Sequence, residues 1–600
     1  MRSASGRRPD KVQKTGSGSW GLALGMFATM AGAVWVTGEI SGALTHGSWP
    51  QVSPADAGRI LVLLVSHPLR PPAAWPLAAR KAIPGAGIYY AVLTGTLVLG
   101  SVVAWSGFAT VRRLTQGPRP RLHQNGPGLL SSLCSLTTTG TSPHRHRSGR
   151  SIIPTHGTSW ARTKDLRTLI VSGPSPGRLT LGRSGGKYLA AEARQSVIVV
   201  GPTQTMKTSG FAVPAILEWE GPVLATSVKA DLVRDTLSWR STTGQVWLYD
   251  PTASTGLPTA GWSPLASSIS WAGARRMAAA LCSAARVNGD GMSEADFWYA
   301  TAAKLLAPLL LAAAASGRTM TDVVRWVDTQ EVDEVDAILN ALGIHQAIQA
   351  AWASWRREDR QRSSVYATAE TIIEAFADPS VSASAARSEI DPTALLDGGR
   401  HSLYVCAPAH EQRRLRPVFS ALVNQVLVAA YERASLRGEP LDPPLLVVLD
   451  EAANVAPLSE LDAIAATAAG HGIQLVTVWQ DMAQVAARYG PRAATVVNNH
   501  RAKVVLSGIS DPATLEHVSM LVGDQDVPQS STTTDAEGRH STTDTTTRQR
   551  LAPADALRRI SPGEGVLIYG HLPPARLSLR PWFADRELAR RAAPRPSGRP

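Results

Sequence analysis

The segment from Ser196 to Glu218 restricts the fold of this chain more than any other. It begins with a short β-branched run, SVIVV (196–200), which is typical of a buried strand. The turn GPTQTMKTS follows at 201–209, and a helical pattern then continues to Glu218. The amides of such a turn and of a helix N-terminus point at the same anion. The order of strand, glycine turn, Lys-Thr and helix therefore predicts a phosphate-binding loop (P-loop) in an α/β sheet.

In this interpretation all nine turn residues bind nucleotide: Gly201, Pro202, Thr203, Gln204, Thr205, Met206, Lys207, Thr208 and Ser209. We expect Lys207 to reach the β- and γ-phosphates of ATP and the Thr208 hydroxyl to hold Mg²⁺. Met206 stands where the usual pattern has glycine, which approaches phosphate closely and adopts positive φ at little cost. This methionine argues against tight binding or hydrolysis, and a chance turn before a helix is the alternative.

Two further apolar strands are predicted to end in polar side chains. Leu445–Leu449 precedes Asp450 and Glu451. We expect Asp450 to bind Mg²⁺ through water and Glu451 to polarise the attacking water. The alternative is an acidic pair at a helix start, which the helix dipole favours. Ile473–Trp479 precedes Gln480, which we expect to sense the γ-phosphate, unless it only caps a strand end.

Short apolar runs alternate with helical patterns beyond residue 165, which predicts a parallel α/β sheet. The segment 227–231 follows another such run at 222–226. Ligands of α/β sheets bind at the carboxyl ends of the strands, so this segment is expected to line the same crevice.

Two apolar runs near the N-terminus predict a membrane anchor at residues 20–111. The run 20–40 contains one charged residue, Glu39, and the run 88–111 contains none. A helix of that length covers roughly 30 Å, the thickness of the hydrocarbon core of a bilayer. Residues 41–87 form the connecting loop. A cleaved signal peptide is the alternative for the first run.

The net charge of +13 is concentrated around these runs. Residues 1–19 carry five basic residues and one acid, and residues 112–164 carry nine basic residues and no acid. The lysine and arginine bias predicts a two-pass protein of the plasma membrane, with both termini in the cytoplasm and 41–87 outside. The basic segment 112–165, rich in Pro, Gly and Ser, is expected to be a flexible linker.

Seven segments together resemble the TraG/TraD-type conjugative coupling proteins, membrane-anchored relatives of the FtsK/HerA ATPases. They are GPTQTMKTSG, ATSVKADLV, LYDPT, DFWYATAAKLL, VVLDEAANVAPL, LVTVWQDMAQVAARYG and NNHRAKVVLSG. The resemblance covers both predicted spans and nearly everything from about residue 180 to 583. It implies a RecA-like P-loop NTPase domain at 166–264 and 392–583 and an all-α insertion at 265–391. The arginines near the C-terminal end predict a basic tail at 584–600.

The resemblance also implies an ATP-driven motor. It would couple a relaxase–DNA complex to a type IV secretion channel and move DNA without reading its sequence. The family forms homo-hexamers with ATP and Mg²⁺ at subunit interfaces, where a neighbour's arginine stabilises transition-state charge. Arg492 is the candidate for that arginine, and Arg501 is the alternative.

Two other functions stay open at this point. The first is a nucleotide-binding membrane recruitment scaffold with weak or no hydrolysis, which Met206 and the absence of arginine just before the Gln480 strand favour. The second is a double-stranded DNA pump of the chromosome-segregation type. Its four-helix anchor and winged helix are not apparent in the sequence.

Two C-terminal segments are expected to lack regular structure. Residues 527–548 are rich in Thr and Ser and predict a flexible loop. The arginine-rich end from residue 586 to 600 predicts a disordered tail.

Overall fold

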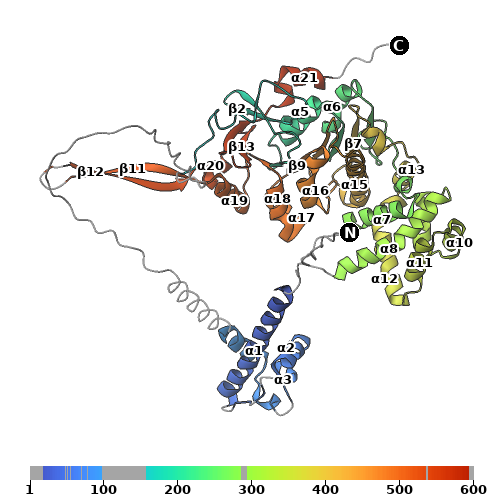
Figure 1. Cartoon of the computed structure of the whole chain (residues 1–600), viewed down its shortest axis with the longest axis vertical. Coiled ribbons are helices and arrows are strands. Elements are labelled where there is room, and N and C mark those ends of the chain that lie inside the picture. The colour runs from blue at the N-terminus through green and yellow to red at the C-terminus, as the bar shows by residue number, and fades with distance from the viewer. Residues whose placement is uncertain are drawn as a thin grey trace, which may run out of the picture. The chain divides into compact units, whose positions relative to one another are not determined.

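The computed structural model describes residues 18–96, 157–285 and 294–593, apart from short gaps at 47–48, 51, 54–55, 69, 77–78, 535–537 and 539. The chain divides into two compact units, Met1–Arg145 and His146–Pro600 (Figure 1). Each unit is described by itself.

The N-terminal unit is helical where it is described. Its elements are α1 (Gly18–His46), α2 (Ala57–Ser66), α3 (Pro71–Ala74), the 3₁₀ turn η2 (Arg80–Ala82) and a helical stretch at 86–96. Trp75 and Tyr89 are fully buried in a small apolar core. Gly38 of α1 lies so close to Trp75 that an added Cβ would be 1.8 Å from the indole ring. The predicted loop 41–87 therefore contains helices packed on α1.

The predicted membrane spans stay predictions. The first run lies in α1, whereas residues 97–111 of the second run and 112–156 of the linker lie outside the described residues. Among the described residues, one helical stretch is long and apolar enough to cross a membrane, Asp296–Ala315. That stretch is mostly buried in the second unit, as expected of a core helix.

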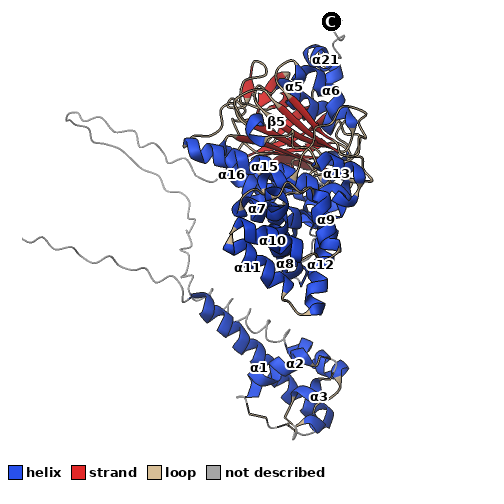
Figure 2. Cartoon of the chain, turned by 90° about the vertical axis from the view of Figure 1, so that its right-hand side faces the viewer, coloured by secondary structure: helices blue, strands red, loops and turns tan. Residues whose placement is uncertain are grey.

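A mixed sheet of twelve strands forms the centre of the second unit, as far as that unit is described (Figure 2). The strands are β1 (Ile170–Val171), β2 (Thr180–Ser184), β3 (Lys187–Ala190), β4 (Val197–Val200), β5 (Val223–Ser227), β6 (Val246–Tyr249), β7 (Ser402–Cys406), β8 (Leu445–Leu449), β9 (Ile473–Trp479), β10 (Ala502–Leu506), β13 (Glu564–Tyr569) and β14 (Ala575–Ser578). Their spatial order is β1-β3-β2-β14-β13-β10-β4-β9-β8-β5-β7-β6.

The stretch from β10 to β6 in this order is entirely parallel. Strands β4, β5, β8 and β9 are buried at every residue. Burial on both faces explains the wholly apolar sequences of β4 and β8 and the mainly apolar sequences of β5 and β9. The strands from β13 to β1 pair antiparallel and extend the sheet on the β10 side. The parallel part places the carboxyl ends of its strands along one edge.

Helices cover both faces of the sheet. One face carries the π-helical turn η3 (Thr208–Ala212), α5 (Val213–Glu218), α6 (Ala230–Ser241) and α21 (Arg586–Ala592), whose apolar side chains share one core cluster. The other face carries α15 (Gln412–Arg437), α16 (Leu461–Thr467), the 3₁₀ turn η6 (Ala468–His471), α17 (Met482–Tyr489), the 3₁₀ turn η7 (Gly490–Arg492), α18 (Ala493–Asn499), α19 (Pro512–Val522) and α20 (Ala554–Arg558).

A helical bundle follows β6, and no strand is described in it before β7. Its elements are η4 (Pro264–Ser267), α7 (Trp271–Ala285), α8 (Glu294–Ala315), α9 (Met320–Asp328), α10 (Asp333–Leu342), α11 (His345–Trp355), α12 (Asp359–Ile373), η5 (Glu374–Ala377), α13 (Pro379–Ala385) and α14 (Pro392–Leu395). The leucines of α8 from Leu305 to Leu310 are buried at its centre, and α7, α11 and α12 pack around them (Figure 2).

Residues 524–534 and 540–550 form an exposed β-ribbon, so the prediction of a flexible loop at 527–548 is wrong for these residues. Strands β11 (Asp524–Thr534) and β12 (His540–Arg550) pair antiparallel along their whole length. Threonine is β-branched and favours extended backbone, and Thr532 lies opposite Thr542. At the base, Arg550 forms an ion pair with Asp524 at 3.2 Å. The polar composition of 527–548 favours a loop, but threonines in facing positions stabilise a solvent-exposed ribbon instead.

The expected disorder of the C-terminal tail is also wrong for residues 586–592, which form α21. Asp585 caps this helix by accepting hydrogen bonds from the amides of Glu587 and Leu588. Leu588 and Ala592, spaced i and i+4, are buried against the sheet-covering helices. The apolar pattern of α21 is hard to recognise in the sequence, because it consists of a few residues among several arginines.

Gly472 occupies a turn that no other residue fits, which gives a stability prediction. Its φ is +79°, and an added Cβ would lie 2.3 Å from the backbone nitrogen of Leu441. We expect Gly472→Ala to destabilise the chain by about 2 kcal/mol or more and to lower the Tm in thermal unfolding. Gly470→Ala is the matched control, because a Cβ there meets no atom within 4 Å. Equal Tm values for the two variants would contradict this account.

Candidate nucleotide-binding site

The sheet topology brings the three predicted polar segments to one place. Strand β9, which precedes Gln480, lies between β4 and β8 and pairs parallel with both. The backbone amide of Gly201 donates to the carbonyl oxygen of Trp479 at 3.1 Å. The backbone amide of Ala452 donates to the carbonyl oxygen of Val478, also at 3.1 Å. The predicted P-loop, Gln480 and the acidic pair therefore leave three adjacent strands at the same edge.

A direct contact joins the P-loop to the acidic strand. The Thr208 hydroxyl donates to Oδ2 of Asp450 at 2.9 Å, across 242 residues of sequence. A hydroxyl and a carboxylate at this distance can share one small divalent cation, because both are the hard oxygen donors that Mg²⁺ prefers. The two residues that we predict to hold magnesium are therefore neighbours.

Asp450 is strongly desolvated. It is 5% exposed, and burial raises the pKa of its carboxyl to about 6. The Thr208 hydrogen bond opposes this rise, whereas the nearby charges of Glu451 and Asp231 add to it. A buried carboxylate crowded by two others favours a cation, which would relieve the repulsion.

Lys207 points into its own loop. Its ammonium group donates to the carbonyls of Gly201 and Pro202 at 2.5 Å. Burial lowers the pKa of Lys207, the charges of Asp450 and Glu451 oppose that change, and Lys229 adds to it. The ammonium therefore lies within the electrostatic reach of both carboxylates, and a bound phosphate would compete with the loop carbonyls for it.

The backbone of the loop is left-handed at two residues. Gln204 and Met206 have φ values of +67° and +63°. The φ at Met206 is the one that the usual glycine adopts freely, and it costs an ordinary side chain about 1 kcal/mol. The Thr205 hydroxyl donates to the carbonyl of Pro202 at 2.8 Å and closes the turn. Thr203 and Gln204 are exposed, and Ser209 is half-buried in η3.

The side chain of Met206 packs against the antiparallel part of the sheet. It is half-buried and contacts the core cluster that includes Leu579. Its sulfur lies 3.5 Å from where a Cβ on Gly563 would stand, in the turn before β13. These contacts account for the methionine as a packing residue beside the loop.

The three predicted catalytic residues lie in different settings. Glu451 is half-buried with φ +57°, and its Oε2 accepts a 3.3 Å hydrogen bond from Asn454. Gln480 is half-buried at the end of β9, and its backbone N–H donates to Oε1 of Gln484. Arg492 is 47% exposed and pairs with Asp462 at 3.2 Å. Among the described residues, its hydrogen bonds and ion pairs go to the segment 459–462 and not to the P-loop.

Sequence reasoning placed 227–231 beside the site but assigned no role to its charges. The effects of Lys229 on Lys207 and of Asp231 on Asp450 give the segment an electrostatic part. The π-helical turn η3, directly after Lys207, was missed. No sequence signal distinguishes it from an ordinary first helical turn, although such turns often mark functional sites.

The residues present fit a magnesium nucleotide. The loop supplies a lysine, a hydroxyl and amides at a helix start, and the strand end supplies a buried carboxylate. No group of three or more His, Cys, Asp or Glu side chains in the described part of the chain could hold a metal ion. Thr208 and Asp450 would therefore hold a divalent cation together with oxygens of the nucleotide or of water.

Comparison with known proteins identifies the family. The family model for type IV secretory system conjugative DNA transfer matches residues 160–597. Conjugal transfer protein TraG of Escherichia coli is 25% identical over 428 residues, which cover 63% of this chain and 66% of TraG. Protein VirD4 of Agrobacterium fabrum is 24% identical over 457 residues, covering 72% and 67%. The chain thus spans about two thirds of the length of these two relatives.

The solved structure of plasmid coupling protein TrwB in complex with ADP and Mg²⁺ has a similar fold, with a TM-score of 0.55 at 19% identity over 71% of this chain and 94% of that one. The unbound TrwB structure gives a TM-score of 0.56. The mixed α/β fold is therefore that of TrwB. With a family model that covers most of the sequence, the chain belongs to the type IV secretory system conjugative DNA transfer family.

Proposed function

We propose that this chain is a membrane-anchored ATPase that couples a relaxase–DNA complex to a type IV secretion channel and drives DNA transfer. The observation that carries the ATPase part is the 2.9 Å contact between Thr208 and Asp450, which joins the P-loop to the acidic strand. The conjugative context comes from the family and from the relatives TraG, VirD4 and TrwB.

Each predicted residue has one task at the site. Lys207 would exchange its loop carbonyls for the β- and γ-phosphates of ATP, and the amides of 203–209 would surround them. Thr208 and Asp450 would hold Mg²⁺, which when bound neutralises phosphate charge. Glu451 would polarise the attacking water, and Gln480, at the end of the strand between, would sense the γ-phosphate.

The proposed assembly is a homo-hexamer anchored in the plasma membrane by two spans, with both termini cytoplasmic. A neighbouring subunit would then supply Arg492 to the nucleotide. Its 47% exposure and its ion pair with Asp462 in place of a P-loop residue suit a residue that acts on another subunit. The ring would hold DNA through its phosphates and contact relaxosome proteins and channel subunits.

A recruitment scaffold with weak hydrolysis is the second candidate. Met206 in a left-handed conformation is the specific observation that favours it. A loop that resists small backbone adjustments could bind nucleotide yet position the γ-phosphate poorly. Two of the following experiments separate the two functions.

Replacement of Lys207 tests the ATPase. We expect Lys207→Ala to lower DNA-stimulated phosphate release at least about 100-fold, because the variant loses the cation that stabilises phosphate charge. The control is Lys187→Ala, which alters an exposed lysine on β3. Phosphate release that is equally low in the wild type and in Lys207→Ala would reject the ATPase in favour of the scaffold.

Met206→Gly tests whether the methionine limits turnover. Glycine relieves the φ of +63° but also loses the packing on the turn at Gly563, and these effects oppose each other. We therefore expect the ATPase rate of Met206→Gly to stay within about threefold of wild type, which corresponds to less than 1 kcal/mol. A variant that hydrolyses ATP while the wild type does not would support the scaffold.

The raised pKa of Asp450 predicts pH-dependent magnesium binding. The ordinary value of 3.8 rises to about 6, so the carboxyl takes up a proton as pH falls through 6. The free protein gains stability at this group in that window, whereas Mg²⁺ must displace the proton. We expect Mg²⁺-dependent ADP affinity, measured by calorimetry, to fall about tenfold per pH unit below 6. In Asp450→Asn, the pH dependence of the affinity should fall to the part that comes from protonation of ADP itself. If Asp450→Asn keeps the wild-type pH profile, Asp450 is not the group that titrates.

A further inference from the structure

We propose that the C-terminal strap, defined as residues 579–592, positions the nucleotide-binding loop, and that Arg580 is its main positioning residue. The inference rests on the proposed function, because it concerns the same nucleotide site. The strap follows β14, contains the 3₁₀ turn η8 (Trp582–Ala584) and α21, and packs on α5 and α6 (Figure 1). Helix α5 continues the P-loop through η3, so the strap touches the element that carries Lys207 and Thr208.

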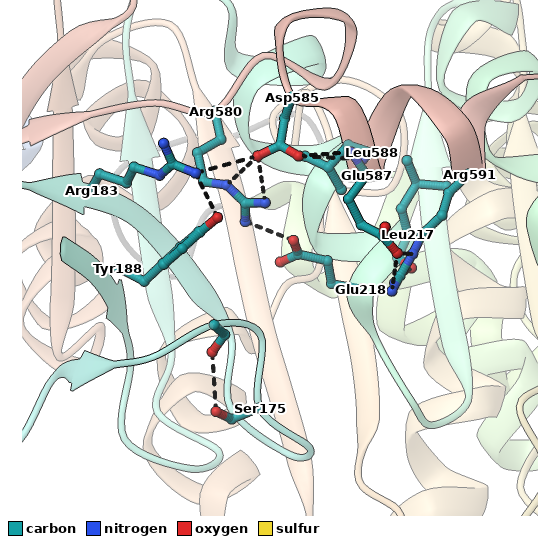
Figure 3. A network of polar contacts seen from close by, with 11 residues as sticks. Ser175, Arg183, Tyr188, Leu217, Glu218, Arg580, Asp585, Glu587, Leu588 and Arg591 are labelled. Carbon is teal, nitrogen blue, oxygen red and sulfur yellow. Dashed lines mark hydrogen bonds and ion pairs between the residues drawn. The ribbon is translucent and has the colours of Figure 1, made fainter. Parts of the chain in front are cut away.

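The first contact is a buried ion pair at the end of α5. Arg580 donates from Nη1 to Oε1 of Glu218, the last residue of α5, at 2.6 Å. Its Nε and Nη2 donate to Oδ2 of Asp585 at 3.2 and 2.9 Å (Figure 3). The side chains of Arg580 and Glu218 are 5% and 6% exposed. One guanidinium thus ties α5 to the residue that caps α21.

An aromatic ring supports this guanidinium from the sheet. The Arg580 guanidinium carbon lies 4.7 Å from the ring centre of Tyr188 on β3, and that of Arg183 lies 4.4 Å from the same ring. Arg183 also donates to the Tyr188 hydroxyl (Figure 3). Burial opposes the charge of Arg580, but Glu218 and Asp585 outweigh burial and raise its pKa. The Arg580 guanidinium therefore keeps its charge although it is buried.

The second contact caps the same helix from α21. Nη1 of Arg591 donates to the carbonyl of Leu217 at 2.8 Å, near the C-terminus of α5 (Figure 3). Its guanidinium carbon lies 4.9 Å from the ring centre of Trp239 on α6. A cation at a helix C-terminus satisfies a carbonyl that has no partner within the helix. Two arginines of the strap thus hold adjacent residues of α5.

The third contact reaches the start of the helix. An added Cβ on Gly210, in the π-helical turn, would lie 3.2 Å from both Cβ and Cδ1 of Leu579. The amide of Arg580 also faces the Gly210 carbonyl at 3.4 Å. The Leu579 amide donates to the carbonyl of Gly563 at 2.7 Å, beside the Met206 sulfur. The strap therefore contacts the P-loop element at its beginning and at its end.

This arrangement favours positioning over simple stabilisation. A buried ion pair contributes little net stability, because desolvation offsets the attraction, but it selects one geometry. The geometry selected here includes the place of Thr208, whose hydroxyl is 2.9 Å from Asp450. A shift of α5 by about 1 Å would break that hydrogen bond. A loosened strap is therefore expected to weaken nucleotide binding at a distance.

The test compares MgADP affinity, amide hydrogen exchange and Tm in variants of the full chain. We expect Arg580→Met to raise the Kd for MgADP at least about fivefold and to speed exchange at residues 203–212 without nucleotide. Arg590→Met on α21 is the matched control. Arg590 is largely exposed and pairs only with Glu587 in the described part of the chain, so its variant should keep the wild-type Kd within about twofold.

Gly472→Ala controls for lost stability, because Gly472 precedes β9, at the opposite end of that strand from Gln480, and its added Cβ would meet Leu441. It should lower the Tm while leaving the Kd near the wild-type value. If Arg580→Met does not fold, Arg591→Met replaces it with the same expected direction. If Arg580→Met (or Arg591→Met in its place) leaves the Kd unchanged, or if Gly472→Ala raises the Kd equally, the positioning role is overturned. The proposed function is not affected by either result. A wild-type chain that binds no MgADP overturns the proposed function and the strap with it.

Discussion

The hydrogen bond between Thr208 and Asp450 depends on the parallel pairing of β4, β9 and β8. All three strands are buried at every residue, and β4 and β8 are apolar throughout, so their side chains pack the sheet and do not line the site. The chemistry begins only at the residue after each strand. The pairing registers of these three strands therefore determine where the polar residues that follow them lie.

These registers also explain why much of the site could be predicted. A buried parallel strand has a distinctive sequence, and the residue after it has a nearly fixed place in space. The loop 201–209, Asp450 and Gln480 were found in this way, and their adjacency follows from the topology. The conformation at Met206 was also anticipated in physical terms, because the position requires a positive φ that glycine ordinarily supplies.

The rest depended on contacts that no local pattern reveals. Arg580 lies 362 residues from Glu218 along the chain, and the sequence assigned it no role beyond a place near the end of the predicted motor domain. The polarity of 527–548 suggests a loop, but the preference of threonine for extended backbone favours the ribbon. The helices within 41–87 pack on α1 through Trp75, and a hydropathy pattern does not show that packing. In each case long-range packing decided the structure.

The ribbon of β11 and β12 carries a consequence of its own. Both of its outer edges present backbone groups to solvent, which ordinarily invites pairing with a foreign strand and aggregation. Pro528 removes one amide from β11, and Asp544 and Arg548 place charges along β12. With hydroxyls in place of large apolar side chains, a second strand would bury little by adding to either edge. The charges, the proline and the hydroxyl side chains of the ribbon therefore disfavour the addition of a further strand to either edge.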